Sequence, residues 1–317
     1  MDLSIVIPVY NEEESIEPLI RETRSVLGPL EKKYEVILVD DGSTDGTYPI
    51  LLRLHENEPK IKVVRLKRNF GQTAAIAAGL AYAKGAVVIA MDGDGQNDPK
   101  DIPTLLNKID EGFDLVSGWR FPRHDPFLSR QFPSQIANAL ISWTTQVKLH
   151  DYGCTLKAMR RDVAKDLKLY GEMHRFIPVM AYERGARIAE IMVHHRPRRW
   201  GRSKYGISRT LRVILDLLTV KFMLSYATRP LHVFGFLGLA SGGGGFLIAL
   251  YLTVQKLFYG SAIGGRPLLL LAVLLIFIGF QFITMGLLGE MLSRTYHESQ
   301  DKPIYVVKEV LGEGRSL

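Results

Sequence analysis

The chain has 317 residues, 47% of them hydrophobic, which is enough for one good-sized domain and a smaller additional part. A total of 40 Lys and Arg against 33 Asp and Glu gives a formal net charge of +7, so an anionic partner is expected: nucleic acid, phospholipid or a phosphorylated substrate. The single cysteine, Cys154, excludes an internal disulfide and has no metal-ligand spacing, so a reducing compartment is the simpler expectation. Because Asp2 and an early strand leave no basic segment at the start, no signal peptide is expected.

The N-terminal part alternates between strand and helix patterns. Short apolar runs predict strands at residues 3–9, 34–39, 62–66, 86–91 and 114–117. Helical patterns lie between them, around residues 13–27, 45–56, 71–84 and 101–111. This order predicts parallel strands with right-handed crossovers, in an α/β sheet that resembles a Rossmann fold.

Polar clusters follow three of these strands, at residues 10–13, at residues 40–45 and from Asp92 onward. Because parallel strands end at one edge of a sheet, the three clusters are expected to lie close together. Part of the second cluster, residues 43–45, also suits the cap of the following helix, and one turn can serve both purposes. No GxGxxG follows the first strand and no GxxxxGK[ST] occurs, which argues against a dinucleotide enzyme and a P-loop ATPase.

The apolar run at residues 87–91 stops at Asp92 and Asp94. The glycine between them allows backbone angles that turn both carboxylates toward one point. Together with the neutral oxygen of Gln96, they suit Mg²⁺ or Mn²⁺, whose other positions take water and substrate phosphates. The alternative is an Asp/Gly-rich turn that binds nothing, because the DxD pattern is short and common.

Three motifs, Ile-Pro-Val-Tyr-Asn-Glu at 7–12, Val-Asp-Asp-Gly-Ser-Thr-Asp at 39–45 and Asp-Gly-Asp-Gly-Gln at 92–96, resemble the GT-A glycosyltransferases of family 2. The resemblance implies that the first two motifs hold the base and ribose of a nucleotide, and that the third holds a metal and the diphosphate. It assigns the nucleoside to Pro8, Tyr10, Glu12, Asp40 and Asp41. It assigns the metal to Asp92, Asp94 and Gln96, with Asp94 also counted as catalytic.

The second half narrows the resemblance. Residues 151–161, the loop at 201–206 and the tail are similar to the polyprenyl-phosphate glycosyltransferases, a subfamily that includes dolichol-phosphate mannose synthase and bacterial undecaprenyl-phosphate transferases. The similarity runs nearly end to end and its motifs fall in family order. It is specific for the family and weakly specific for the sugar.

Two long apolar stretches, at residues 230–258 and 268–288, predict transmembrane helices, because about 20 apolar residues span a bilayer. The connection at residues 259–267 holds one Arg, whereas the flanking segments are richer in Lys and Arg. Both termini are therefore expected on the cytoplasmic side of the inner membrane. Gly238 and Gly242 form a GxxxG pair, which predicts close packing against another helix or subunit.

Ahead of the first span, residues 207–222 place apolar side chains on one helical face and polar ones on another. This pattern is typical of a helix in the membrane interface, or of a soluble helix that packs on the domain. A second apolar stripe at residues 136–147 fits core packing and membrane contact equally. The expected organisation is a cytoplasmic GT-A catalytic domain at 1–206, a juxtamembrane amphipathic helix at 207–228, a two-helix transmembrane domain at 229–293 and a cytoplasmic tail at 294–317.

An acceptor phosphate needs positioning more than deprotonation, because it is already anionic at neutral pH. The groups that suit its oxygens are Arg120, Arg130, Ser134, Arg202 and Lys204. The alternative for any one of these arginines is a solvated charge on the surface. The resemblance implies that Asp151 is a catalytic base; positioning of the acceptor or of its own loop is the alternative. His194 and His195 alternate with strand residues and are expected to be structural.

These features predict an inverting, metal-dependent enzyme that transfers a hexose from a nucleotide diphosphate sugar to a polyprenyl phosphate at the cytoplasmic membrane face. The preferred donor is UDP-glucose and the preferred acceptor is undecaprenyl phosphate. The expected partners are membrane lipid and a second copy of the chain, and nucleic acid is not expected to bind. A processive polysaccharide synthase is the nearest alternative, because residues 196–200 resemble its QxxRW motif, with Arg196 in place of Gln. A non-catalytic membrane-anchored nucleotide-sugar binder is the alternative from another class.

Overall fold

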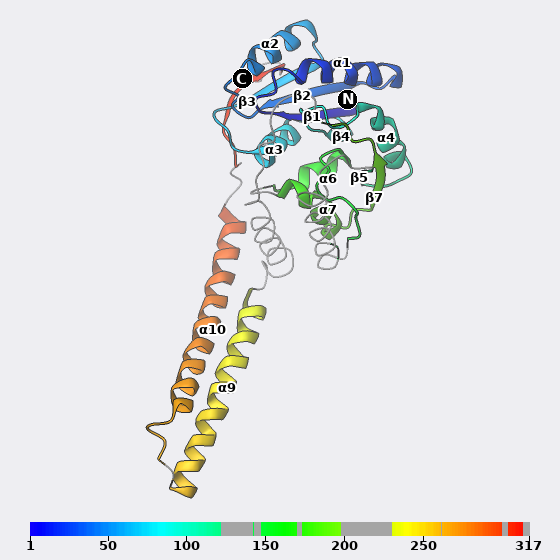
Figure 1. Ribbon diagram of the computed structural model, residues 1–317. Coiled ribbons are helices and arrows are strands. Elements are labelled where there is room, and N and C mark those ends of the chain that lie inside the picture. Colours follow the sequence, from blue (N-terminus) through cyan, green and yellow to red (C-terminus); the bar gives the residue numbers. More distant parts are fainter. Residues whose placement is uncertain are drawn as a thin grey trace. The chain divides into compact units, whose positions relative to one another are not determined.

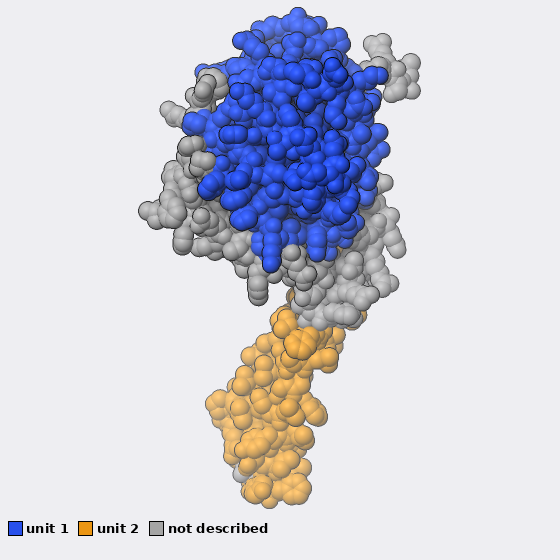
Figure 2. Space-filling view, turned by 90° about the vertical axis from the view of Figure 1, so that its right-hand side faces the viewer, with its two compact units in different colours: residues 1–218, 303–317 blue, residues 219–302 orange. Residues whose placement is uncertain are grey.

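A computed structural model describes residues 1–121, 142, 147–169, 173–197, 230–260, 262–299 and 304–312. The chain divides into two compact units, which Figure 2 shows in blue and orange. The first comprises residues 1–218 together with 303–317, and the second comprises residues 219–302. The last residues of the chain therefore belong to the same unit as the first.

The described strands of the first unit form one eight-stranded sheet in the order β7-β5-β6-β4-β1-β2-β3-β8. Their bounds are β1 Leu3–Val9, β2 Tyr34–Asp40, β3 Ile61–Leu66, β4 Val87–Ala90, β5 Leu115–Arg120, β6 Lys157–Arg160, β7 Ile188–Val193 and β8 Val307–Leu311. The helices are α1 Ile16–Leu27, α2 Thr47–Asn57, α3 Gln72–Tyr82, α4 Ile102–Asp110, α6 Arg161–Asp166 and α7 Ile177–Glu183. Short 3₁₀ turns are η1 Gly28–Leu30, η2 Pro99–Asp101 and η4 Met173–Phe176.

The sheet is mostly parallel, as the sequence predicts. Strands β1, β2, β3 and β4 pair in parallel, and β5 pairs in parallel with β7. Strand β6 is antiparallel to both β4 and β5, so β5 runs in the same direction as β4. The carboxyl ends of β1, β2, β4 and β5 therefore share one edge of the sheet, which is where ligands of such sheets bind.

Helices cover both faces of this sheet (Figure 1). Apolar residues of α1 and α4 pack with alternate residues of the strands, such as Ile5, in the main core cluster. The other face meets α3, where a Cβ on Gly79 would lie 2.2 Å from Val6 Cγ1 and 3.1 Å from Val39 Cγ2. Only glycine allows α3 to approach β1 and β2 this closely. Burial on both faces explains why β2 is buried along its whole length.

The second unit contains α9 (Pro230–Tyr259) and α10 (Pro267–Ser299) (Figure 1). The most apolar 18-residue windows of Phe234–Tyr259 and Pro267–Gly289 have mean hydropathies of 1.6 and 2.7, and only 17% and 11% of these windows are buried. Helices of this length and composition suit a bilayer, and their exposure distinguishes them from the core helices of a soluble protein. The two predicted spans are thus present as helices. The predicted juxtamembrane helix at 207–228 lies outside the described residues.

Glycines of α9 and α10 face each other within this unit. A Cβ on Gly238 would lie 2.6 Å from Ile283 Cγ1 and 2.7 Å from the carbonyl oxygen of Gly279. One on Gly245 would lie 2.6 Å from the carbonyl oxygen of Ala272. The predicted glycine face therefore lets two helices of one chain pack closely.

Candidate active site

The loop after β4 carries the predicted metal residues. Asp92 Oδ1 accepts a hydrogen bond from Gln72 Nε2 at 2.6 Å, and the backbone N–H of Asp92 donates to Asn97 Oδ1 at 3.1 Å. Asp94 Oδ1 accepts from the backbone N–H of Gln96 at 3.1 Å. The first residue of α3 thus orients the carboxylate of Asp92, and the loop itself orients that of Asp94.

Two glycines shape this loop. A Cβ on Gly93 would lie 3.0 Å from the carbonyl oxygen of Pro8, so the loop passes directly against β1. Gly95 has a φ of 72°, in the left-handed region that favours glycine. The close contact at Gly93 and the positive φ at Gly95 explain why glycines alternate with aspartates in the DGDG motif. They also bring the predicted metal loop beside the predicted nucleoside loop.

Asp92 is buried beside the charge of Asp94, and both conditions oppose its ionisation. Burial, and next the charge of Asp94, raise the pKa of Asp92 to about 6, while Thr155, Arg120 and Lys157 act in the opposite direction. A divalent cation would remove this repulsion, so the pair fits Mg²⁺ or Mn²⁺ held by few protein ligands. Among the described residues no group of three or more His, Cys, Asp or Glu side chains could hold a metal ion. Water and substrate phosphate would have to supply its remaining ligands.

The predicted nucleoside carboxylates follow β2 at the same edge. Asp41 accepts hydrogen bonds from the backbone N–H groups of Phe70 at 2.7 Å and Gly71 at 2.9 Å, which fixes the turn that leads into α3. Burial raises the pKa of Asp41. Asp40 accepts from the backbone N–H of Ser43 at 2.9 Å. Asp41 thus stabilises the loop and Asp40 stands at its base.

The motif after β1 joins the other two. Ser15 Oγ lies 2.7 Å from Glu12 Oε2 and 2.9 Å from the carbonyl oxygen of Gly93, so it links this motif to the DGDG loop. Pro8 lies in β1, and Tyr10 follows that strand. The structure therefore brings the three sequence motifs to one edge of the sheet, as predicted.

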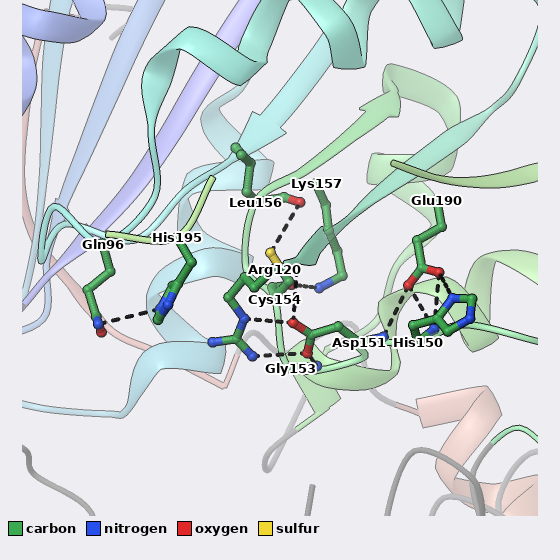
Figure 3. Close-up of polar contacts among 10 residues, drawn as sticks. All are labelled: Gln96, Arg120, His150, Asp151, Gly153, Cys154, Leu156, Lys157, Glu190 and His195. Carbon is green, nitrogen blue, oxygen red and sulfur yellow. Dashed lines mark hydrogen bonds and ion pairs between the residues drawn. The ribbon is translucent and has the colours of Figure 1, made fainter. Parts of the chain in front are cut away.

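Asp151 forms a second centre beside them (Figure 3). Arg120 Nε lies 2.7 Å from Asp151 Oδ2, and Arg120 Nη2 lies 2.9 Å from Asp151 Oδ1, so the guanidinium grips the carboxylate with two bonds. Glu190 of β7 accepts from the backbone N–H groups of His150 at 2.9 Å and Asp151 at 3.1 Å. The Asp151 loop is thereby attached to the last residue of β5 and to the middle of β7.

Sequence reasoning missed Gln72, Glu190 and Lys157. The Lys157 side chain is only 2% exposed; its ammonium donates to the carbonyl oxygen of Cys154 (Figure 3), and burial lowers its pKa. The charges of Cys154, Asp151 and Asp92 act on the Lys157 pKa in the opposite direction, so Lys157 interacts electrostatically with carboxylates of both centres. The sequence signal for Lys157 was a charged residue within the mostly apolar run that contains β6. The sequence has no comparable signal for Glu190 or Gln72, because only the fold brings these two residues to the site.

His194 and His195, which were predicted to be structural, contact residues that follow the DGDG motif. His194 Nδ1 lies 2.8 Å from Asp101 Oδ1, and His195 is buried and forms a β-bridge with Asn97. Gln96 Nε2 lies 3.5 Å from His195 Nε2 (Figure 3), and the Gln96 carbonyl oxygen accepts from the backbone N–H of Arg196. Gln96 is thus placed by residues 195–196 as well as by its own loop.

Four predicted acceptor residues, Arg130, Ser134, Arg202 and Lys204, lie outside the described residues. Arg120, the fifth, lies at the end of β5 against Asp151. The structure does not test whether any of these five residues contacts a phosphate, so their assignment to the acceptor phosphate stays a prediction.

The order of the sheet and the polar motifs at its carboxyl edge are those of the GT-A fold. A family model for glycosyl transferase family 2 matches residues 4–168. The chain is 46% identical to a dodecaprenyl-phosphate galacturonate synthase of Rhizobium johnstonii, over 99% of this chain and 94% of that protein. It is 40% identical to an undecaprenyl-phosphate 4-deoxy-4-formamido-L-arabinose transferase of Salmonella choleraesuis, over 98% of this chain and 93% of that protein.

Solved structures agree on the fold. Glucosyl-3-phosphoglycerate synthase of Mycobacterium tuberculosis, in complex with Mn²⁺, UDP and glucosyl-3-phosphoglycerate, superposes with a TM-score of 0.55 at 20% identity, over 69% of this chain and 79% of that chain. Its complex with Mn²⁺ and UDP-glucose gives a TM-score of 0.55 over 69% and 78%. The chain belongs to glycosyltransferase family 2 and is a glycosyltransferase. The predicted resemblance to its polyprenyl-phosphate subfamily is confirmed.

Proposed function

We propose that this enzyme transfers a sugar from a nucleotide diphosphate sugar to a polyprenyl phosphate, with inversion and with a divalent cation. Relatives that cover almost the whole chain have names stating transfer of sugars to dodecaprenyl or undecaprenyl phosphate, which supports this acceptor class. The two exposed apolar helices support a membrane substrate. The observation that carries the proposal is the row of three motifs at one sheet edge, beside the Asp151–Arg120 pair.

The proposed reaction is a single displacement. An anionic oxygen of the acceptor phosphate bonds to the anomeric carbon of the sugar, while the bond to the nucleoside diphosphate breaks and that group leaves with the electron pair. A divalent cation, when bound at Asp92 and Asp94, supplies positive charge where the leaving diphosphate accumulates negative charge. Gln72 orients Asp92 for this role, and the Gln96 oxygen is the proposed additional ligand.

Asp151 is proposed to position Arg120, which would direct a fixed cation toward an anionic substrate group. The two-bond contact with the guanidinium supports this role over that of a base, since an ionised phosphate needs little deprotonation. Arg130, Ser134, Arg202 and Lys204 remain proposed ligands of the acceptor phosphate. Pro8, Tyr10, Glu12, Asp40 and Asp41 remain proposed for the nucleoside, and the base is proposed to be uracil.

The sugar proposed first is a hexuronate or a 4-formamido-pentose, because galacturonate and 4-deoxy-4-formamido-L-arabinose are the sugars that the relatives' names state. UDP-glucose, preferred from the sequence, has no support among these relatives and ranks behind them. The processive polysaccharide synthase also loses support. Arg196, which stands in the place of the motif's Gln, is held by ion pairs with Asp98 at 2.8 Å and Glu22 at 2.5 Å.

A transfer assay tests the proposal. Purified full-length protein in detergent, undecaprenyl phosphate and Mn²⁺ are incubated with a panel of radiolabelled sugar nucleotides, and labelled lipid is extracted. We expect transfer from one donor, and a loss of about 100-fold or more for Asp94→Asn, because a bound cation contributes several kcal/mol. Asp166→Asn, on an exposed carboxylate of α6, is the matched control and should keep the wild-type rate. Near-normal turnover by Asp94→Asn with saturating Mn²⁺ would remove Asp94 from the metal site.

A further inference from the structure

Asp40, Arg65 and Glu309 lie opposite one another on three adjacent strands. The register of β2 and β3 pairs Asp40 with Arg65, and the register of β3 and β8 pairs Arg65 with Glu309. Side chains of register partners on neighbouring strands project from the same face of a sheet. The three residues therefore form a row across the sheet at the carboxyl end of β2, where the nucleotide is proposed to bind.

Helix α2 completes the row through Tyr48. Arg65 Nε lies 3.4 Å from Asp40 Oδ2, and the guanidinium carbon of Arg65 lies 3.6 Å from the centre of the Tyr48 ring. The Tyr48 hydroxyl donates to Glu309 Oε2 at 2.5 Å. A continuous series of contacts thus runs from the C-terminal strand to a carboxylate at the proposed nucleoside site.

Asp40 is a group whose orientation depends on few neighbours. It is fully buried, and its described contacts are the backbone N–H of Ser43 on one oxygen and the guanidinium of Arg65 near the other. A guanidinium on a flexible side chain needs restraint to hold such a contact, and stacking on an aromatic face supplies it. The Tyr48 ring restrains Arg65 only when the tyrosine hydroxyl is itself anchored. Glu309 accepts the hydrogen bond that anchors it.

We propose that β8 is a positioning element of the nucleotide site, in which Glu309 and Tyr48 hold Arg65 and thereby orient Asp40. The inference rests on the proposed nucleoside role of Asp40. Strand β8 follows both apolar helices in the chain, and the backbone N–H of Lys67 donating to the Val306 carbonyl oxygen at 2.9 Å extends its attachment to β3. The tail after the membrane helices is in this way part of the donor site.

Calorimetry on the full-length protein in detergent tests the proposal. The probes are UDP, GDP and CDP with Mn²⁺, and the one that wild-type protein binds most tightly is used for the variants. Tyr48→Phe retains the aromatic ring but removes the hydroxyl that anchors it over Arg65; Glu309→Ala removes the acceptor of that hydroxyl. We expect each variant to weaken binding about two- to tenfold, the range for one lost hydrogen bond, with unchanged turnover at saturating donor. The double variant should be no weaker than either single variant, since both break the same contact.

The control is Lys308→Gln, the neighbouring exposed residue, which the register between β3 and β8 skips and which should bind as wild type does. Asp40→Asn separates the two hypotheses. Unchanged binding by Asp40→Asn rejects the nucleoside role of Asp40 and the inference with it. Weakened binding by Asp40→Asn, with wild-type affinity in Tyr48→Phe and Glu309→Ala, leaves the proposed function standing and overturns the positioning role. Reduced turnover with unchanged affinity in those two variants also overturns it.

Discussion

Asp92 is a carboxylate whose charged form the apo protein disfavours. Burial and the charge of Asp94 raise its pKa to about 6, above the ordinary value of 3.8. A group whose pKa is raised by folding adds stability at low pH, and this contribution is lost as the pH rises through the folded-state pKa. Above about pH 6 the apo site therefore holds an unfavourable charge that a divalent cation would relieve.

The resulting prediction is that Mn²⁺ raises the melting temperature more at about pH 7.5 than at about pH 5, where protons compete for the site. Asp92→Asn should lose most of the Mn²⁺ effect at both pH values and be less destabilised in the apo form at the higher pH. Thermal unfolding in detergent, with Mn²⁺ or with a chelator, measures both effects. An equal Mn²⁺ effect at the two pH values in the wild-type protein would contradict the assignment of Asp92.

How much of the site the sequence predicts depends on how local each residue's role is. Asp92 and Asp41 follow strands directly, so the end of an apolar run located them. Gln72 and Glu190 reach the site through the position of α3 and the register of β7 beside β5, which no spacing in the sequence encodes. Arg65 belongs to a predicted strand, but only the pairing of β3 with β2 places it opposite Asp40.

At the scale of elements, the strands buried on both faces were predicted to within one or two residues at most ends. β1, for example, has the predicted bounds. β6 and β8 were missed because each is antiparallel, has only four or five residues, and shows no clear alternation of apolar and polar side chains. Both pair only because neighbouring strands offer free edges, which is a property of the assembled sheet.

The helix pair of the second unit allows a sharp test of a predicted element contact. Gly238→Leu should destabilise the protein by about 1–3 kcal/mol or more, because its Cβ would meet the backbone carbonyl of Gly279, which cannot rotate away. Gly243→Leu is the matched control on the same helix, since a Cβ there meets no atom within 4 Å. Thermal unfolding in detergent compares them. Equal stability of the two variants would mean that α9 and α10 do not pack through this face.

For the whole molecule, the pairing of β8 with β3 restricts how the chain meets a membrane. β3 precedes both apolar helices and β8 follows them, yet the two strands belong to one sheet. Residues 219–302 therefore leave the first unit and return to it. If α9 and α10 both cross a bilayer, the connection between them must lie on the side opposite the sheet. The distribution of Lys and Arg predicts that the sheet is on the cytoplasmic side.

Cysteine labelling tests this topology, since Cys154, the one native cysteine, is buried and should give little background. Gly264→Cys probes the connection, while Lys32→Cys and Lys308→Cys probe exposed positions before and after the helices. In bacterial spheroplasts a membrane-impermeant maleimide should label only Gly264→Cys, and the other two should react after permeabilisation. Labelling of Lys32→Cys and Lys308→Cys from opposite sides would contradict the single sheet. Labelling of both from outside, with Gly264→Cys protected, would keep the helical hairpin and reverse its orientation, and equal labelling of all three would show that the helices do not span.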